Sequence, residues 1–429
     1  MNARILLAKT VLGVAVTGIL IAGAVVALNL RGEDPVDDSA FTLEGTSAQV
    51  ERGRYLALAG NCAGCHTARG GAPYAGGNGI ETPFGTIYAS NLTPDAKTGI
   101  GRWNADHFWR AMHHGRSRDG RLLYPAFPYT SFTHITREDS DAMYVWLRTL
   151  PPTTQPNREH DLDFPYNTQA ALAVWRALYF SPGREEAKAP EDGAYPSAEW
   201  HRGAYLVRGL GHCAACHGSR NAMGATDAAH ALAGGMLPGG KWYAPALDAA
   251  SEAGVAGWST DEVVALLKSG RTEHASVSGP MAEVVYRSTQ HLRDEDLRAM
   301  ATYLQALPAR PEPSQEPAAR RSDSLMKRGE RIYAQQCAWC HGERGEGVPG
   351  AFPRLAGNRA VSLANPANLV QIVRRGGYPP VTEGNPRPYG MPPFGQFLDD
   401  AEIAAVLTYV RGSWGNDAAE VTQRDAVRR

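Results

Sequence analysis

One five-residue pattern occurs three times in this chain, as Cys62-Ala-Gly-Cys65-His66, Cys213-Ala-Ala-Cys216-His217 and Cys337-Ala-Trp-Cys340-His341. It uses all 6 cysteines of the 429-residue chain, so none is left over for a disulfide. C-x-x-C-H is the attachment signature of c-type haem: the two cysteines form thioethers to the porphyrin, and the adjacent histidine ligates the iron. A zinc site would need a second cysteine pair, and a thioredoxin-like pair would not need the histidine. The sequence therefore predicts three covalently bound haem c groups, attached through Cys62, Cys65, Cys213, Cys216, Cys337 and Cys340, with His66, His217 and His341 as proximal iron ligands.

The sequence around the three motifs repeats as well. Upstream of each, an Arg-Gly pair begins an amphipathic helical stretch, at Arg52-Gly53, Arg202-Gly203 and Arg328-Gly329. Downstream, each unit ends in a helical stretch that begins with acidic residues, as suits a helix N-terminus: residues 138–150, 294–307 and 399–412. A glycine on the first helix, facing an aromatic residue on the last, would let the two helices cross closely. We therefore expect an all-α fold of three tandem helical bundles with little or no strand.

Composition suggests where these units begin and end. Residues 151–165 are rich in proline and polar residues, and residues 308–317 are rich in proline, which indicates extended linkers. The predicted organisation is an anchor or signal segment (1–31), a first haem domain (46–152), a linker with a helical segment (153–191), a second haem domain (192–308), a proline-rich linker (309–322), a third haem domain (323–415) and a tail (416–429).

The linker between the first two units has apolar residues at helical spacing between Phe164 and Phe180. The simpler interpretation is a helix packed on its own domains. The alternative is a helix that contacts a partner or a membrane.

The N-terminal segment is long and apolar enough to be a membrane anchor. The run from Thr10 to Leu30 carries no charge, and it can cross a hydrocarbon core of about 30 Å. Arg4 and Lys9 precede the run and acidic residues follow it, which predicts a cytoplasmic N-terminus. The alternative is a cleaved signal peptide. Both interpretations place the remainder of the chain in the periplasm, and the anchor would hold it at the inner membrane.

The charge balance excludes one class of partner. Lys and Arg number 43 against 44 Asp and Glu, for a net charge of -1, and no basic block is present, so a nucleic-acid partner is not expected. The chain also lacks a dinucleotide-binding glycine fingerprint. We therefore predict no catalytic residue for substrate chemistry, and we expect an electron-transfer subunit.

The sixth iron ligand decides what each haem can do, because His/Met iron suits electron transfer whereas an open position permits chemistry. Met391 lies in a loop before the final helix and is the only methionine after Cys337. Met281 occupies the corresponding loop of the second haem domain. We expect both to be distal ligands.

The first haem domain lacks a methionine at the corresponding position. Internal alignment places Pro125-Ala126-Phe127 where Pro280-Met281 stands, and neither alanine nor phenylalanine can ligate iron. His134 is a candidate in the same general region, with His113 nearby. We therefore expect haem 1 to have bis-His ligation or a weak or absent sixth ligand, and a lower potential than the other two.

One proline in each unit stands between the haem motif and the distal loop: Pro83, Pro245 and Pro353. Their carbonyls, or neighbouring ones, are candidates to accept the N–H of the proximal histidine and fix its orientation. A simple turn is the alternative for each proline.

Several longer motifs resemble those of the three-haem cytochrome c subunits of bacterial membrane-bound alcohol, gluconate, sorbitol and aldehyde dehydrogenases. These motifs include residues 82–88, 91–101, 123–125, 279–285 and 408–415. The resemblance implies class I cytochrome c domains. It also implies electron transfer from a dehydrogenase subunit of molybdenum, quinoprotein or flavin type to ubiquinone or a terminal oxidase. In that family the loop around Phe127 usually contains methionine, and the phenylalanine version resembles cytochromes that accompany molybdenum hydroxylases.

Two alternative functions follow from the same residues. The missing methionine of the first unit favours a peroxidase-like multihaem enzyme that uses haem 1. Three haems on one tethered chain would also suit a cytochrome module of a terminal oxidase.

Overall fold

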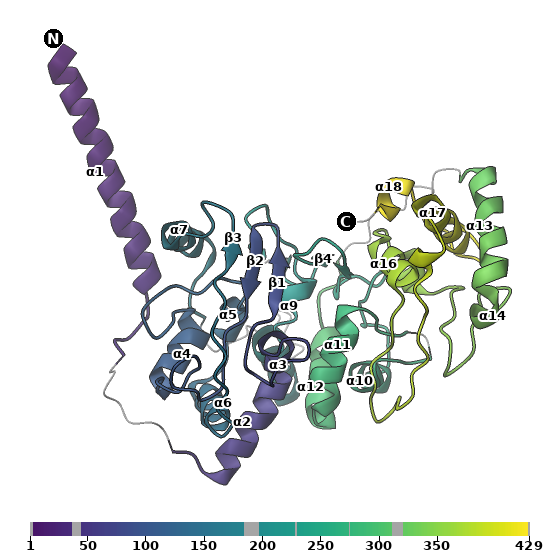
Figure 1. Ribbon diagram of the computed structural model, residues 1–429, viewed down its shortest axis with the longest axis horizontal. Helices are drawn as coiled ribbons and strands as arrows, with labels where there is room; N and C mark the ends of the chain where they lie inside the picture. Colours follow the sequence, from purple (N-terminus) through teal and green to yellow (C-terminus); the bar gives the residue numbers. More distant parts are fainter. Residues whose placement is uncertain are drawn as a thin grey trace. The chain divides into compact units, whose positions relative to one another are not determined.

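The computed structural model describes residues 3–36, 44–183, 197–227, 230–273, 275–310 and 321–427. The chain divides into two compact units (Figure 1). The first comprises Met1–Gly53 and Ala68–Glu186, and the second comprises Arg54–Thr67 and Ala187–Arg429. The first haem motif thus belongs to the second unit, although the sequence places it in the first haem domain.

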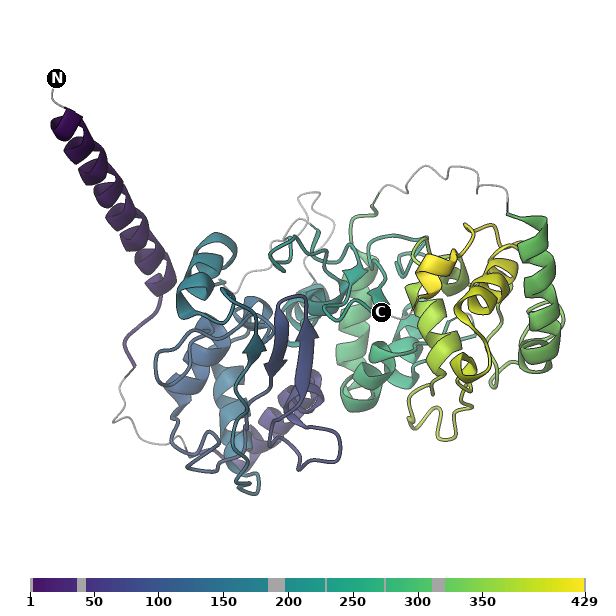
Figure 2. The same ribbon diagram turned by 45° about the horizontal axis from the view of Figure 1, so that its top comes forward.

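The first unit is mostly helical but also contains a small sheet (Figure 2). Its helices are α1 (Ala3–Leu30), the first part of α2 (Ser47–Ala59), α4 (Ala105–His114), α5 (Tyr129–Phe132), α6 (Arg137–Arg148) and α7 (Gln169–Tyr179). Three short antiparallel strands, in the order β1-β2-β3, form the sheet: β1 (Gly79–Thr82), β2 (Gly85–Tyr88) and β3 (Asp161–Leu162). In its register Gly79 pairs with Tyr88 and Gly85 pairs with Leu162. The all-α expectation did not include this sheet.

The second unit contains the haem motifs and most of the remaining helices. The elements that precede residue 310 are α3 (Cys62–His66), α8 (Ala198–Ala204), the π-helical turn η1 (Tyr205–Leu210), α9 (Ala214–His217), β4 (Gly235–Met236), β5 (Tyr243–Ala244), α10 (Thr260–Ser269), α11 (Pro280–Arg287), η3 (Thr289–His291) and α12 (Asp294–Gln305). The later elements are α13 (Asp323–Gln336), α14 (Ala338–His341), α15 (Arg359–Ser362), α16 (Ala367–Arg375), η4 (Phe394–Gln396), α17 (Asp400–Arg411) and α18 (Gln423–Ala426). The three expected acid-led helices are therefore present as α6, α12 and α17.

A glycine-mediated helix crossing occurs three times in the chain. A Cβ atom on Gly53 would overlap the backbone carbonyl of Ala142, and the same holds for Gly203 with Ala299 and Gly329 with Ala405. The Cβ of an aromatic residue packs on each glycine from the same partner helix: Trp146, Tyr303 and Tyr409. This confirms the expected close crossing, in which backbone meets backbone because the glycine has no side chain.

An ion pair repeats beside each crossing. In each repeat, the arginine that directly precedes the glycine pairs with an acidic residue on the partner helix. This acidic residue lies three positions before the alanine whose carbonyl the glycine approaches. Arg52 binds Asp139 at 2.7 Å, Arg202 binds Asp296 at 2.6 Å and Arg328 lies 3.3 Å from Glu402. Glycine and arginine occupy the same relative positions each time, so the internal repeat of the sequence is also a repeat of packing geometry.

We expect Gly203→Ala to destabilise the second unit by roughly 1–3 kcal/mol, because the added methyl forces α8 away from α12. Gly257→Ala is the matched control, since a Cβ there meets no atom within 4 Å. Denaturant unfolding of the haem-loaded variants measures the difference. Equal unfolding midpoints for the two variants would contradict the importance of the crossing.

Candidate functional site

The three C-x-x-C-H segments form short helices, α3, α9 and α14, and none of their six cysteines is in a disulfide. Burial raises the pKa of the Cys62 and Cys213 thiols to about 12 and that of Cys337 to about 11. A redox-active thiol needs a lowered pKa instead. The environment of these cysteines therefore disfavours thiol–disulfide chemistry.

The proximal histidines of the second and third motifs are oriented by backbone carbonyls. Nδ1 of His217 donates to the carbonyl of Pro245 at 2.7 Å, and Nδ1 of His341 donates to that of Pro353 at 2.9 Å. This confirms the expectation for both prolines. The pair His66 and Pro83 is divided between the two units and stays a prediction.

This hydrogen bond leaves Nε2 as the unprotonated ring nitrogen, which is the atom available to a metal. Burial also lowers the pKa of His217 and His341, so both rings are held neutral. A neutral, oriented imidazole beside two cysteines is the donor set of a covalently bound haem. The residues of these motifs therefore fit haem c.

The two methionines predicted as distal ligands lie in backbone segments that are held firmly. The N–H of Gly377 donates to the carbonyl of Met391 at 3.0 Å, and the N–H of Met391 donates back at 2.8 Å. Met281 lies in the first turn of α11, where Gly279 has a φ of 54° and packs on the ring of Trp242. Iron ligation by Met281 and Met391 stays a prediction.

In the first unit, His134 follows α5 and lies close enough to His113 to affect it electrostatically. Burial, with further contributions from His114 and His134, lowers the pKa of His113 to about 4. The His113 ring stacks on Trp109 at 4.3 Å, and its Nδ1 atom is buried without a hydrogen-bond partner among the described residues. The structure thus brings together His134 and the neighbouring His113, which the sequence treated as secondary. Which group ligates haem 1 stays a prediction.

The segment that leads into the first haem motif contacts the second haem domain at the residue before its motif, a feature that sequence reasoning did not predict. Nε2 of His212, the residue before Cys213, lies 3.2 Å from the carbonyl of Gly60. Ser288 Oγ donates to the carbonyl of Ala59 at 3.2 Å. The charge of Cys216 also raises the pKa of Cys65, second to burial. The two attachment segments therefore lie against each other within the second unit.

A buried carboxylate holds the helix that leads into the first motif. Tyr55 Oη donates to Asp296, which also accepts from Arg202. Burial opposes ionisation of Asp296, but these hydrogen bonds outweigh it and hold its pKa below the ordinary value. Burial and the bond to Asp296 raise the pKa of Tyr55, so the hydroxyl stays protonated and donates.

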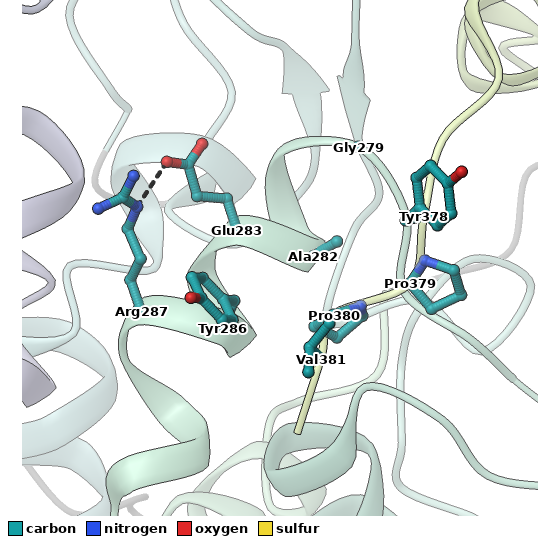
Figure 3. Close-up of a pocket in the computed structure, with 9 residues that line it drawn as sticks. All are labelled: Gly279, Ala282, Glu283, Tyr286, Arg287, Tyr378, Pro379, Pro380 and Val381. Atoms are coloured by element: carbon teal, nitrogen blue, oxygen red, sulfur yellow. Dashed lines mark hydrogen bonds and ion pairs between the residues drawn. The ribbon is translucent and has the colours of Figure 1, made fainter. Parts of the chain in front are cut away.

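The segment that carries Met281 also meets the loop that leads to Met391. A pocket of about 400 Å³ lies between α11 and residues 378–381 of the loop that leads to Met391 (Figure 3). Arg287 and Glu283 form an ion pair of 2.7 Å at its rim. A further contact between the second and third haem domains joins Arg271, just after α10, to the carbonyl of Gly350, to which it donates at 2.6 Å. α11 therefore carries Met281 and also contacts the segment that precedes Met391.

Comparison with known families supports the haem assignment. The cytochrome c family model matches residues 50–151 and 202–308. The model described as cytochrome c oxidase, cbb3-type, subunit III matches residues 324–410.

Curated relatives match almost the whole chain. The cytochrome c subunit of alcohol dehydrogenase (quinone) from Komagataeibacter europaeus is 39% identical over 91% of this chain and 86% of the relative. The gluconate 2-dehydrogenase cytochrome c subunit from Pantoea cypripedii is 37% identical over 90% of both chains. A subunit of nicotinate dehydrogenase from Pseudomonas putida is 42% identical over 87% of this chain, although the match spans 31% of that relative. Together with the oriented histidines and the cysteine pairs, these matches show that the chain belongs to the family of cytochrome c subunits of dehydrogenase complexes.

Proposed function

We propose that this chain is a membrane-tethered, three-haem electron-transfer subunit. It takes electrons from a periplasmic dehydrogenase subunit and delivers them to ubiquinone or a terminal oxidase. The observation that carries this proposal is the contact between the segments that lead into the first two haem motifs, in which His212 meets the Gly60 carbonyl. Haem c supplies the change of iron oxidation state, and the chain supplies the spacing between the irons.

Short separation matters because electron tunnelling falls steeply with distance. The ring of His212, the residue before Cys213, lies within hydrogen-bond distance of the carbonyl of Gly60, two residues before Cys62. Haems attached at these two motifs would therefore lie near each other. α11 extends this arrangement toward the third motif through its contact with residues 378–381. These contacts support a function in which the three haems, when bound, would form one continuous series.

The N-terminal helix supports the membrane tether. Within α1, the segment Lys9–Leu30 has a mean hydropathy of 2.6 and none of it is buried in the protein. A long apolar helix of which no residue is buried is suited to a lipid environment.

Among partner classes we favour a molybdenum-containing dehydrogenase over a quinoprotein or flavin enzyme. Two observations support this choice: the loop of Ala126 and Phe127 lacks the methionine that the family resemblance implies there, and the chain is 42% identical, over 87% of its length, to the nicotinate dehydrogenase polypeptide. A second function, as a cytochrome module of a terminal oxidase, is favoured by the match of residues 324–410 to a cbb3-type subunit.

Affinity purification of the detergent-solubilised protein from native membranes tests these assignments. We expect a dehydrogenase catalytic subunit that contains molybdenum to co-purify. Recovery of a haem–copper subunit instead would support the oxidase module. Rapid peroxide turnover by the isolated cytochrome would favour the peroxidase-like alternative at haem 1.

Replacement of a distal ligand should change the midpoint potential of only one of the three haems. We expect Met281→Ala to lower the midpoint potential of a single haem, because a methionine ligand raises the potential of haem iron. Met223→Ala, in the same domain at an exposed position, is the control. A redox titration followed by absorbance makes the measurement. An unchanged titration curve for Met281→Ala would remove this residue from the ligand set.

Loss of the Tyr55 hydroxyl should loosen the first motif from the second domain. We expect Tyr55→Phe to lower the stability of the second unit by about 1 kcal/mol, the net contribution of one hydrogen bond. Tyr378→Phe, at a side chain that is 74% exposed, should be neutral. Thermal unfolding compares the two. A neutral Tyr55→Phe would show that the bond to Asp296 does not hold this helix.

A further inference from the structure

Helix α7 is an addition to the cytochrome fold. It lies between the two segments that match the cytochrome c family model, residues 50–151 and 202–308. Its inner face is packed on the first unit through Leu172, Trp175 and Arg176, which are all buried. Gln169 also forms two hydrogen bonds with the backbone of Leu122. The expectation of a helix packed on its own domain is therefore correct for this face.

The opposite face of α7 is exposed and apolar. Ala170, Val174 and Leu178 recur at every fourth residue and are all exposed, Val174 at 48% and Leu178 at 69%. Arg176 is the only charged residue of the helix, and it is 2% exposed beneath the rings of Tyr129 and Phe180. A surface helix in water normally carries charged or polar residues on this face.

Hydrogen bonds fix α7 to the end of the apolar helix α1. Asn29 Nδ2 donates to the carbonyl of Ala173 at 2.9 Å, and Arg176 Nε donates to Asn29 Oδ1 at 2.9 Å. Just beyond α1, Glu33 pairs with Arg116 at 2.8 Å. Because Asn29 is next to the last residue of the apolar segment, Ala173 lies at the depth where that segment ends.

We propose that α7 rests on the lipid bilayer, with Val174 and Leu178 inserted among the lipids beside the end of α1. The inference rests on the proposed function in one respect, that α1 spans the membrane. If α1 spans, then its last turn lies at the boundary between hydrocarbon and headgroups, and α7 is held at that boundary. Tyr179, which is 40% exposed at the end of α7, suits this position because tyrosine concentrates at membrane interfaces.

This contact would give the first unit two points of attachment to the membrane. A single helix lets a domain swivel about its end, whereas a helix plus an interfacial face fixes one orientation. The first haem domain would then be held at a constant height above the membrane.

Cysteine accessibility tests the proposal in the full-length, haem-loaded protein. Leu178→Cys, Ile19→Cys on α1 and Lys97→Cys on an exposed loop are each placed in nanodiscs of phosphatidylethanolamine and phosphatidylglycerol. The measurement is the rate of alkylation by a water-soluble maleimide, with the parent protein as background. We expect Leu178→Cys to react several-fold more slowly than Lys97→Cys, although the fold itself leaves position 178 exposed. Val174→Cys should behave alike and replaces Leu178→Cys if that variant does not assemble.

The outcomes separate this inference from the proposed tether. Fast reaction at position 178 with slow reaction at position 19 would overturn the α7 contact and leave the anchor in place. Fast reaction at both positions would overturn the anchor and the α7 contact together. Protection of position 178 only after addition of the dehydrogenase subunit would assign the face to that partner and overturn the membrane proposal.

Discussion

The close crossing of the first and last helix is the contact on which each haem-binding segment depends. Gly203 allows α8 to lie against the backbone of α12, and the equivalent glycines, Gly53 and Gly329, do the same in their own repeats. An arginine–carboxylate pair beside each glycine fixes the register of the crossing. The cysteine pair follows directly after the first helix of each crossing, so the crossing determines where a covalently attached haem is held.

The proposed electron transfer rests on how these segments are joined. The helix that leads into the first motif is held by Asp296 of the second domain, and His212 then joins the two motifs. α11 carries Met281 and contacts the loop that leads to Met391. In the proposed function, electron transfer would depend on these contacts between the haem segments.

Short-range patterns in the sequence predicted the local features well. The three motifs, the acid-led helices α6, α12 and α17, and the carbonyls of Pro245 and Pro353 all follow from spacing within one repeat. The sheet β1-β2-β3 was missed because its strands are at most four residues long and β3 lies far from β2 in sequence. The contact of His212 with Gly60 was also missed, since it joins residues from different repeats and neither carries a recognisable pairing pattern.

The most direct test of electron transfer through this chain is the reduction of the quinone pool in native membranes by the substrate of the dehydrogenase that binds it. Membranes that contain the chain are compared with membranes from cells that lack it. We expect the c-type haem absorbance to change before the quinone is reduced, and quinone reduction to stop without the chain. Equal rates of quinone reduction in both membranes would show that electrons do not pass through this chain to the quinone.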